Sequence, residues 1–189
     1  MQVESLALPG VKLLRPRLFA DARGRFLESW HSARYAESGL PTQWVQDNVS
    51  FSRAGVLRGL HCQQPFAQGK LVTVLKGRAF DAVVDARVGS PDFGKWVGVE
   101  LDGTSLAQLY IPPGFLHGFV ALEDETLFSY KCTERYEPSA EFSVRWDDPA
   151  IGIEWPVAAP VLAPKDAAAP LLSEIDPARL PRYAVTGTP

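Results

Sequence analysis

Only three histidines, His31, His61 and His117, are available in this sequence to move protons. Two of them lie in glycine-punctuated stretches that we expect to be strands, 57–61 (LRGLH) and 112–118 (PPGFLHG). An imidazole with an unperturbed pKa of about 6.5 can both take up and return a proton near neutral pH. The ordinary alternative is a structural histidine satisfied by a carbonyl. The neighbouring residues must decide between these interpretations.

A metal site is the first possibility that the neighbours raise. The stretch 112–117 (PPGFLH) resembles the second motif of cupins, small jelly-roll barrels that often bind a metal through histidines and a carboxylate. The first cupin motif usually supplies His-x-His, but the matching stretch here, 61–63, reads HCQ and leaves at most two barrel histidines. A first-row metal site is therefore not favoured, although Asp81, Asp85 or Asp166 could complete a weaker His-His-carboxylate set.

Longer stretches resemble one family, the dTDP-4-dehydrorhamnose 3,5-epimerases, in their order and spacing. They are 46–50 (QDNVS), 55–61 (GVLRGLH), 68–72 (QGKLV), 89–91 (GSP), 111–119 (IPPGFLHGF), 146–149 (WDDP) and 164–166 (PKD). The resemblance extends from about residue 4 to about residue 172. It implies a homodimer of jelly-roll subunits that converts dTDP-4-dehydro-6-deoxy-D-glucose to dTDP-4-dehydro-L-rhamnose, without cofactor or metal.

Epimerisation beside a ketone needs a base at the C–H bond, a donor or cation at the enolate oxygen, and an acid on the other face. The family's base maps onto His61, and the family pattern places at Asp166 the carboxylate that fixes the tautomer of this imidazole. Lys70 matches the enolate stabiliser, and Tyr130 matches the proton donor. Each has an ordinary alternative: a helix N-cap for Asp166, an exposed strand edge for Lys70 and a plain strand tyrosine for Tyr130.

The resemblance also implies residues that hold the nucleotide, because remote binding groups can keep the sugar in reactive geometry. They are Arg23, Arg58 and Lys165 near the phosphates or sugar, Gln46, Asn48 and His117 in the cavity, Glu28 and Glu141 at the nucleoside end, and Tyr136 stacked on the base. We expect a partner's N-terminal strand to cover an open sheet edge and to bring Phe19 and Arg23 to the neighbouring site. Alternatively, Arg23 is a solvated turn cation, Tyr136 packs a loop and His117 is structural.

Some features leave the reaction open. Pro164 stands where the family commonly has Ser, and Cys62 and Cys132 adjoin the segments of the expected base and acid. A mono-epimerase acting at C3 or C5 of a related dTDP-4-keto-6-deoxy sugar is the nearest alternative. A metal-dependent cupin oxygenase and a catalytically silent sugar-nucleotide-binding protein are the others.

The elements that must position these residues are short strands. The chain has 189 residues, 46% of them hydrophobic, which predicts a single domain, 1–189, and its 15 Gly and 16 Pro favour an all-β fold. The resemblance implies that this all-β fold is a cupin-type jelly roll, with short peripheral helices. We expect strands within 18–30, 44–51, 55–61, 70–87, 95–101, 106–111, 115–122 and 126–133, and a short helix at 32–38. Gly77 should centre a β-hairpin within 70–87. Nine prolines after Glu137 predict an irregular C-terminal segment.

Charge and composition exclude some classes of protein. The net charge of −3, with no block of like charges, argues against nucleic-acid and membrane-surface binding. The longest uncharged apolar run, 155–164, is far shorter than a bilayer span, and two cysteines are too few for a disulfide scaffold. We therefore expect a soluble, cytoplasmic protein with free thiols.

Overall fold

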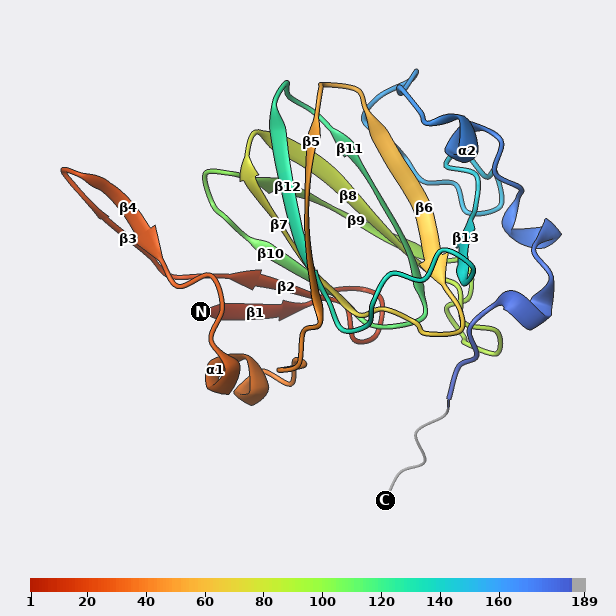
Figure 1. Ribbon diagram of the computed structural model, residues 1–189, viewed down its shortest axis with the longest axis horizontal. Coiled ribbons are helices and arrows are strands. Elements are labelled where there is room, and N and C mark those ends of the chain that lie inside the picture. The colour runs from red at the N-terminus through yellow and green to blue at the C-terminus, as the bar shows by residue number, and fades with distance from the viewer. Residues whose placement is uncertain (185–189) are drawn as a thin grey trace.

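The computed structural model describes residues 1–184, so the last five residues of the predicted domain 1–189 lie outside the described part. Two antiparallel sheets face each other (Figure 1). The six-stranded sheet consists, in order, of β1 (Gln2–Ser5), β2 (Lys12–Arg15), β10 (Gln108–Ile111), β7 (Lys70–Lys76), β12 (Thr126–Cys132) and β5 (Gln46–Ser52). The five-stranded sheet consists of β13 (Glu141–Ser143), β6 (Leu57–Gln63), β11 (Phe115–Ala121), β8 (Arg78–Asp85) and β9 (Trp96–Asp102). This sandwich confirms the predicted all-β jelly roll.

From β5 to β13, every pair of consecutive strands except β8 and β9 is divided between the two sheets, and this corrects one prediction. The hairpin expected around Gly77 is wrong, because β7 pairs with β10 and β12 whereas β8 pairs with β9 and β11. Gly77, at a φ of 77°, makes the turn between the sheets, and a Cβ there would lie 2.6 Å from Thr126 Oγ1. The turn therefore needs glycine, but it delivers the two strands to different partners.

The core fills the space between the sheets with apolar side chains from both. Val72 and Phe128 come from the six-stranded sheet, and Val83 and Phe119 come from the five-stranded sheet. The rings of Phe119 and Phe128 stack across the gap, with centroids 3.7 Å apart and planes 5° from parallel. Full burial of such side chains contributes about 1.5–3 kcal/mol each. This stack holds the two sheets together beside the pocket described below.

The C-terminal segment covers the outer face of the five-stranded sheet, so all seven residues of β11 are buried. The segment is not wholly irregular: β13 adds an edge strand to β6, and α2 (Pro164–Ala167), η1 (Leu172–Glu174) and η2 (Pro177–Arg179) are short helical turns. Proline at the start of α2 and η2 fits these brief helices, since its fixed φ suits a first turn. The segment runs past the end of β6 and carries α2 to that strand.

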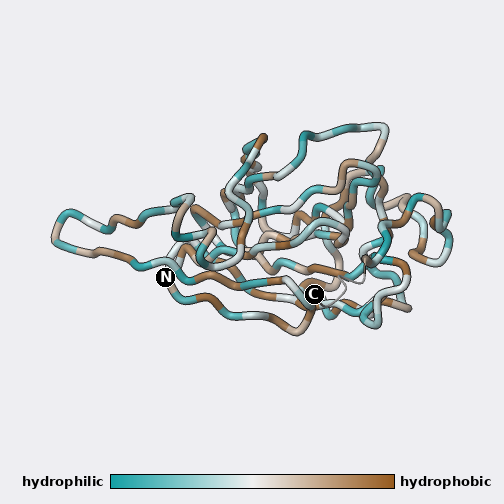
Figure 2. The backbone as a smooth tube through the Cα atoms, turned by 90° about the horizontal axis from the view of Figure 1, so that it is seen from below, coloured by the Kyte–Doolittle hydropathy of each residue, from teal (hydrophilic) through white to brown (hydrophobic). Residues whose placement is uncertain are grey.

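The N-terminal region contains two strands that the sequence analysis did not predict, β1 and β2, which extend the six-stranded sheet. The predicted pair of short strands is present as the hairpin β3 (Leu18–Asp21) and β4 (Gly24–Leu27), followed by α1 (Ser32–Glu37). This hairpin projects away from the sandwich in both views (Figures 1 and 2). Within residues 1–184, no helix has the length and apolar character needed to cross a membrane.

Candidate active site

A pocket of about 480 Å³ opens at the sandwich and is lined from both sheets and from the C-terminal segment. Strands β5, β7 and β12 form one wall, and β6 and β11 form the other. Eleven of the residues predicted to act or bind in the site line this pocket. They are His61, Lys70, Tyr130 and Asp166 of the predicted reaction set, and Gln46, Asn48, Arg58, His117, Tyr136, Glu141 and Lys165 of the predicted binding set.

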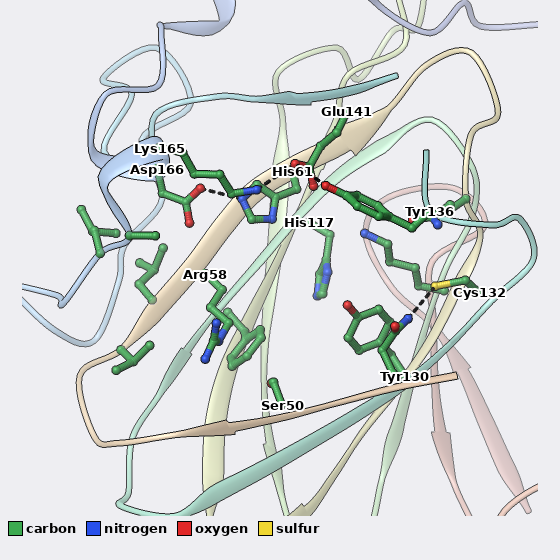
Figure 3. Close-up of a pocket in the computed structure, with 18 of the residues that line it drawn as sticks. Ser50, Arg58, His61, His117, Tyr130, Cys132, Tyr136, Glu141, Lys165 and Asp166 are labelled. Carbon is green, nitrogen blue, oxygen red and sulfur yellow. Dashed lines mark hydrogen bonds and ion pairs between the residues drawn. The ribbon is translucent and has the colours of Figure 1, made fainter. Parts of the chain in front are cut away.

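His61 and Asp166 are in direct contact, although 105 positions separate them in the chain. His61 Nε2 lies 2.7 Å from Asp166 Oδ1, and the Gly59 N–H donates to Asp166 Oδ2 at 3.4 Å. Asp166 is not the N-cap of α2: Pro164 begins the helix after Ala163, which leaves the carboxylate in the first turn, directed at His61. Burial alone would raise the pKa of Asp166, but the His61 and Gly59 hydrogen bonds and the Lys165 charge hold it below its ordinary value. Asp166 is therefore an ionised partner for the ring. Figure 3 shows the contact between the two side chains.

A second histidine–carboxylate pair lies beside the first. His117 stands directly opposite His61 in the register of β11 and β6, and its Nε2 lies 2.9 Å from Asp81 Oδ2. Backbone contact makes this register possible, since a Cβ on Gly59 would lie only 2.5 Å from the Gly118 Cα. Asp81 has no exposed surface, and burial raises its pKa while His117 opposes the rise. Burial likewise lowers the pKa of His117, and Asp81 opposes that change.

Lys70 and Tyr130 approach the histidines from the opposite sheet. Lys70 is not on a sheet edge, because β7 lies between β10 and β12 and the side chain is half-buried at the pocket wall. Tyr130 lies on β12 across the pocket from His61 (Figure 3). Burial raises the pKa of Tyr130, the nearby Cys132 and Glu141 add to the rise, and Arg58 opposes it. At neutral pH the phenol therefore keeps its proton.

The pocket rim carries cations and an aromatic ring. Lys165 Nζ donates to Glu141 Oε2 at 2.7 Å, and the Tyr136 hydroxyl donates to the same oxygen at 3.3 Å. Burial lowers the pKa of Lys165, but Glu141 more than offsets this and raises it. Arg58 Nε donates to Ser52 Oγ at 3.2 Å, which holds the guanidinium beside β5 at the pocket wall. Tyr136 is 48% exposed, so its ring is open to stacking.

Three predicted binding residues do not line this pocket. Phe19 and Arg23 lie on the projecting hairpin, where Arg23 pairs with Asp21 and its side chain is 90% exposed. Glu28 forms a short ion pair with Arg34 in a different hollow, which Phe19 also lines. Within a single chain, these three residues are separate from the other eleven.

Nine of the residues that line the pocket were not predicted as site residues. Three of them are Ser50, Phe119 and Cys132. Each stands two positions from a predicted residue on the same strand: Asn48, His117 and Tyr130 respectively. Because alternate residues of a strand face the same side, the period of two could have identified them. The Ser50 hydroxyl is buried without a hydrogen-bond partner among the described residues.

The weaker metal set considered from the sequence is not assembled. Asp81 pairs with His117, Asp166 pairs with His61, and Asp85 binds Arg87 and Ser90 away from the pocket. Among residues 1–184, no three or more His, Cys, Asp or Glu side chains are grouped so that they could hold a metal ion.

Comparisons with known proteins point to one family. The family model described as dTDP-4-dehydrorhamnose 3,5-epimerase matches residues 5–174. A Neisseria gonorrhoeae protein of that name is 50% identical over 169 residues, 89% of this chain, and the chain spans about half (52%) of its length. The crystal structure of a dTDP-6-deoxy-D-glucose-3,5-epimerase from Legionella pneumophila, in complex with dTDP-4-keto-L-rhamnose, is 48% identical with a TM-score of 0.95 and covers 97% of this chain and 99% of that one. A dTDP-4-dehydrorhamnose 3-epimerase from Streptomyces niveus is 42% identical over 97% of this chain and 90% of its own.

Proposed function

The chain belongs to the dTDP-4-dehydrorhamnose 3,5-epimerase family, and from this we propose that it inverts C3 and C5 of dTDP-4-dehydro-6-deoxy-D-glucose to give dTDP-4-dehydro-L-rhamnose. It is thus an isomerase. One observation carries the assignment of roles: His61, bound to Asp166, and Tyr130 lie on facing sheets and line the same pocket. Inversion requires a base and an acid on opposite faces of one carbon, and this arrangement supplies both.

The reaction begins with proton abstraction beside the 4-ketone. Asp166 accepts the Nε2–H of His61, which leaves the other ring nitrogen, Nδ1, free to take the proton from C3 or C5. The electron pair of the broken C–H bond moves onto the ketone oxygen. Lys70 stabilises this enolate, and its charge is poorly screened at a half-buried position. Tyr130 then returns a proton from the opposite face, and no step in this sequence requires a metal or an organic cofactor.

The nucleotide occupies the rim in this proposal. Arg58 and Lys165 bind the pyrophosphate, for which the planar fork of arginine is suited, and Tyr136 stacks on the thymine. Lys165 then exchanges its contact with Glu141 for a phosphate oxygen.

A mono-epimerase is the second candidate, and the 42% identity to the Streptomyces niveus 3-epimerase favours keeping it. The deciding experiment incubates the protein with dTDP-4-dehydro-6-deoxy-D-glucose in deuterated water and follows the sugar by NMR. Deuterium at both C3 and C5 with the L-rhamnose configuration is the expected result. Deuterium at one carbon would replace the proposal with a mono-epimerase, and no deuterium would contradict the substrate.

The base assignment is tested by His61→Ala. Loss of a positioned general base costs about 10²–10⁴-fold in rate, so exchange at C3 and C5 should fall by that factor. Binding of dTDP, measured by calorimetry, should change little, because the rim cations remain. Wild-type exchange in this variant would show that another residue is the base.

The acid assignment is tested by Tyr130→Phe, which keeps the ring and removes the proton. Abstraction by His61 continues, so deuterium still enters the sugar, while formation of the inverted product slows by about 10²-fold or more. NMR in deuterated water reads both processes in one sample. If exchange and inversion slow together, or neither slows, Tyr130 is not the donor on the second face.

We also propose that two copies form a homodimer in which the β3–β4 hairpin of one reaches the pocket of the other. The hairpin packs on little of its own chain, and its Phe19 and Phe26 are 49% and 68% exposed. A partner would bury these rings and bring Arg23 to a phosphate. This arrangement would unite Phe19, Arg23 and Glu28 with the remaining binding residues.

A further inference from the structure

The two histidine–carboxylate pairs share their geometry but differ in their surroundings. His61 and His117 are cross-strand neighbours, each bound through Nε2 to a carboxylate oxygen, at 2.7 Å and 2.9 Å. Asp166 has both of its oxygens hydrogen-bonded. Asp81 has only one, because its Oδ1 is buried and makes no hydrogen bond within residues 1–184. The two carboxyl groups are therefore solvated very differently by the protein.

An ionised carboxylate is costly where Asp81 lies. The side chain is fully buried, and an oxygen that carries negative charge without a donor loses the full solvation of water. The reference state is an ionised Asp81 beside a neutral His117 ring. The cost falls if the pair binds one proton more than this state. The pair is then neutral overall, whether that proton sits on Asp81 Oδ2 or on His117 Nε2.

In both arrangements of the neutral pair, His117 carries a proton on Nδ1, the ring nitrogen that does not contact Asp81. This nitrogen, Nδ1, makes no hydrogen bond within the described chain, and it is not among the buried atoms that lack a partner. It therefore faces the pocket that His117 lines (Figure 3). We propose that Asp81 is a positioning residue that makes His117 a hydrogen-bond donor, through Nδ1–H, to an oxygen of the bound sugar. His61, backed by an ionised carboxylate, presents an acceptor nitrogen instead.

The charged and titratable groups around the pair are consistent with this assignment. His61 faces His117 from β6, and the Lys70 ammonium faces both members of the pair from β7. Lys70 opposes the rise in the pKa of Asp81, but its effect is smaller than that of burial, and it forms no hydrogen bond to Asp81 among the described residues. Lys70 also disfavours a positive charge on His117. A proton on Asp81 with a neutral imidazole beside it leaves neither buried group charged and leaves no charged oxygen without a donor, so we place the proton there.

The protonation state can be read directly, without substrate. With only three histidines in the chain, long-range ¹H–¹⁵N NMR correlations resolve each imidazole, and the signals that disappear in His117→Gln are those of His117. We expect His117 to be neutral with a protonated Nδ1 at pH 7. The same spectrum should show His61 as the Nε2–H form. A His117 ring with an unprotonated Nδ1 would overturn the proposal.

Paired substitutions test the consequence for turnover. Asparagine can replace a protonated Asp81 as a donor to His117 Nε2, so Asp81→Asn should retain the Nδ1–H signal and lower kcat by no more than about tenfold. Asp81→Leu removes the donor, and we expect kcat to fall a further tenfold or more, with loss of the fixed tautomer. Asp166→Asn is the matched control, because loss of an ionised orienting carboxylate costs up to about 10⁴-fold. Equal losses in Asp81→Asn and Asp166→Asn, with a changed His117 tautomer, would overturn the proposal.

The inference rests on the proposed function only for the identity of the oxygen that His117 binds. If NMR finds the Nδ1–H form but no deuterium enters the dTDP sugar, the substrate assignment fails and the positioning role of Asp81 remains. If deuterium enters at C3 and C5 but His117 is the Nε2–H form, the epimerase assignment stands and this inference fails.

Discussion

At the scale of single residues, the number of hydrogen-bond donors decides whether each of the two aspartates that bind the site histidines is stable as an ion. Asp166 and Asp81 are both buried and both bind an imidazole, yet the pKa of the first lies below its ordinary value and that of the second lies above it. Burial penalises the charge on both, and only Asp166 receives enough donors to offset the penalty. When the pKa values of neighbouring groups are shifted in opposite directions, one group can act as an acid and the other as a base in the same site.

Asp166 should make a pH-dependent contribution to stability. Its pKa is lowered from 3.8 in the folded protein, so its stabilising effect is present above that value and is lost as the pH falls through the lower, folded value. Asp166→Asn should therefore reduce the free energy of unfolding at pH 7 by about 1.5–3 kcal/mol, typical of a hydrogen bond to a charged group. Urea denaturation of both proteins should show this difference shrinking below about pH 4. A difference that persists unchanged in acid would contradict the ionised pair.

The sequence predicts this site well where a residue type and a motif coincide. His61 and Lys70 stand in distinctive stretches, Tyr130 was assigned by the resemblance alone, and all three line the pocket. Asp81 was considered only as a metal ligand, because its contact with His117 depends on the pairing of β8 with β11 across 36 positions. The sequence around Asp81 contains no pattern that indicates which residue of β11 pairs with it.

At the scale of elements, glycine sets how closely strands approach. Gly59 has a φ of 131° and lies against the backbone of Gly118, which brings β6 and β11 together where their two histidines are paired. The N-terminal strands β1 and β2 and the late strand β13 escaped prediction for a related reason. Each has only three or four residues and is held by pairing with a longer strand rather than by its own alternation. The hairpin at Gly77 was predicted from a local turn signal, but the register of distant strands decided its geometry.

Gly59→Ala should therefore disturb both stability and turnover. Its Cβ would lie 2.5 Å from the Gly118 Cα, and a strained φ alone costs about 1–3 kcal/mol. Gly55→Ala is a matched control, since Gly55 also has a positive φ, 80°, but a Cβ there meets nothing within 4 Å. Chemical denaturation should show a larger loss for Gly59→Ala, and only that variant should lose turnover as β6 moves from β11. Equal effects of the two substitutions would mean that close approach of the strands is unimportant.

A buried ion pair between Arg87 and Asp85 helps to attach the C-terminal segment to the sandwich. Arg87 binds Asp85 through two nitrogens, at 2.9 Å and 2.6 Å, and its guanidinium lies between the rings of Phe115 and Tyr183. The backbone of Val88 also exchanges hydrogen bonds with Pro181 and Tyr183. This cluster attaches the end of the described chain to the sandwich.

Asp85→Asn should loosen that attachment in a pH-dependent way. Burial raises the pKa of Asp85, but hydrogen bonds from Arg87 and Ser90 outweigh it and lower the pKa below 3.8, so the stabilisation is present above that value and lost in acid. Amide hydrogen exchange around Val88 and Tyr183 should be faster in the variant at pH 7, and this difference should narrow only below about pH 4, as Asp85 becomes protonated. Unchanged protection at pH 7 would show that the cluster does not hold the segment.

At the scale of the whole molecule, several large apolar side chains are exposed in the single chain, and a partner could cover them. Phe51 and Val49 are 73% and 54% exposed on β5, an edge strand of the six-stranded sheet, and Phe26 is 68% exposed on the projecting hairpin. A symmetric dimer would cover such surfaces and occupy the open edge. It would also make each site depend on residues from two chains, which can be tested by mixing inactive variants.

Mixing Arg23→Glu with His61→Ala, after denaturing and refolding the two together, should restore about a quarter of wild-type activity. Half of the randomly formed dimers contain one chain of each kind, and one of their two sites then has an intact His61 from its own chain and an intact Arg23 from the partner. Mixing His61→Ala with Asp166→Asn is the control, because both residues belong to the same chain's pocket and no mixed dimer gains an intact site. If the first mixture gives no more activity than the control, the hairpin does not complete the neighbouring site.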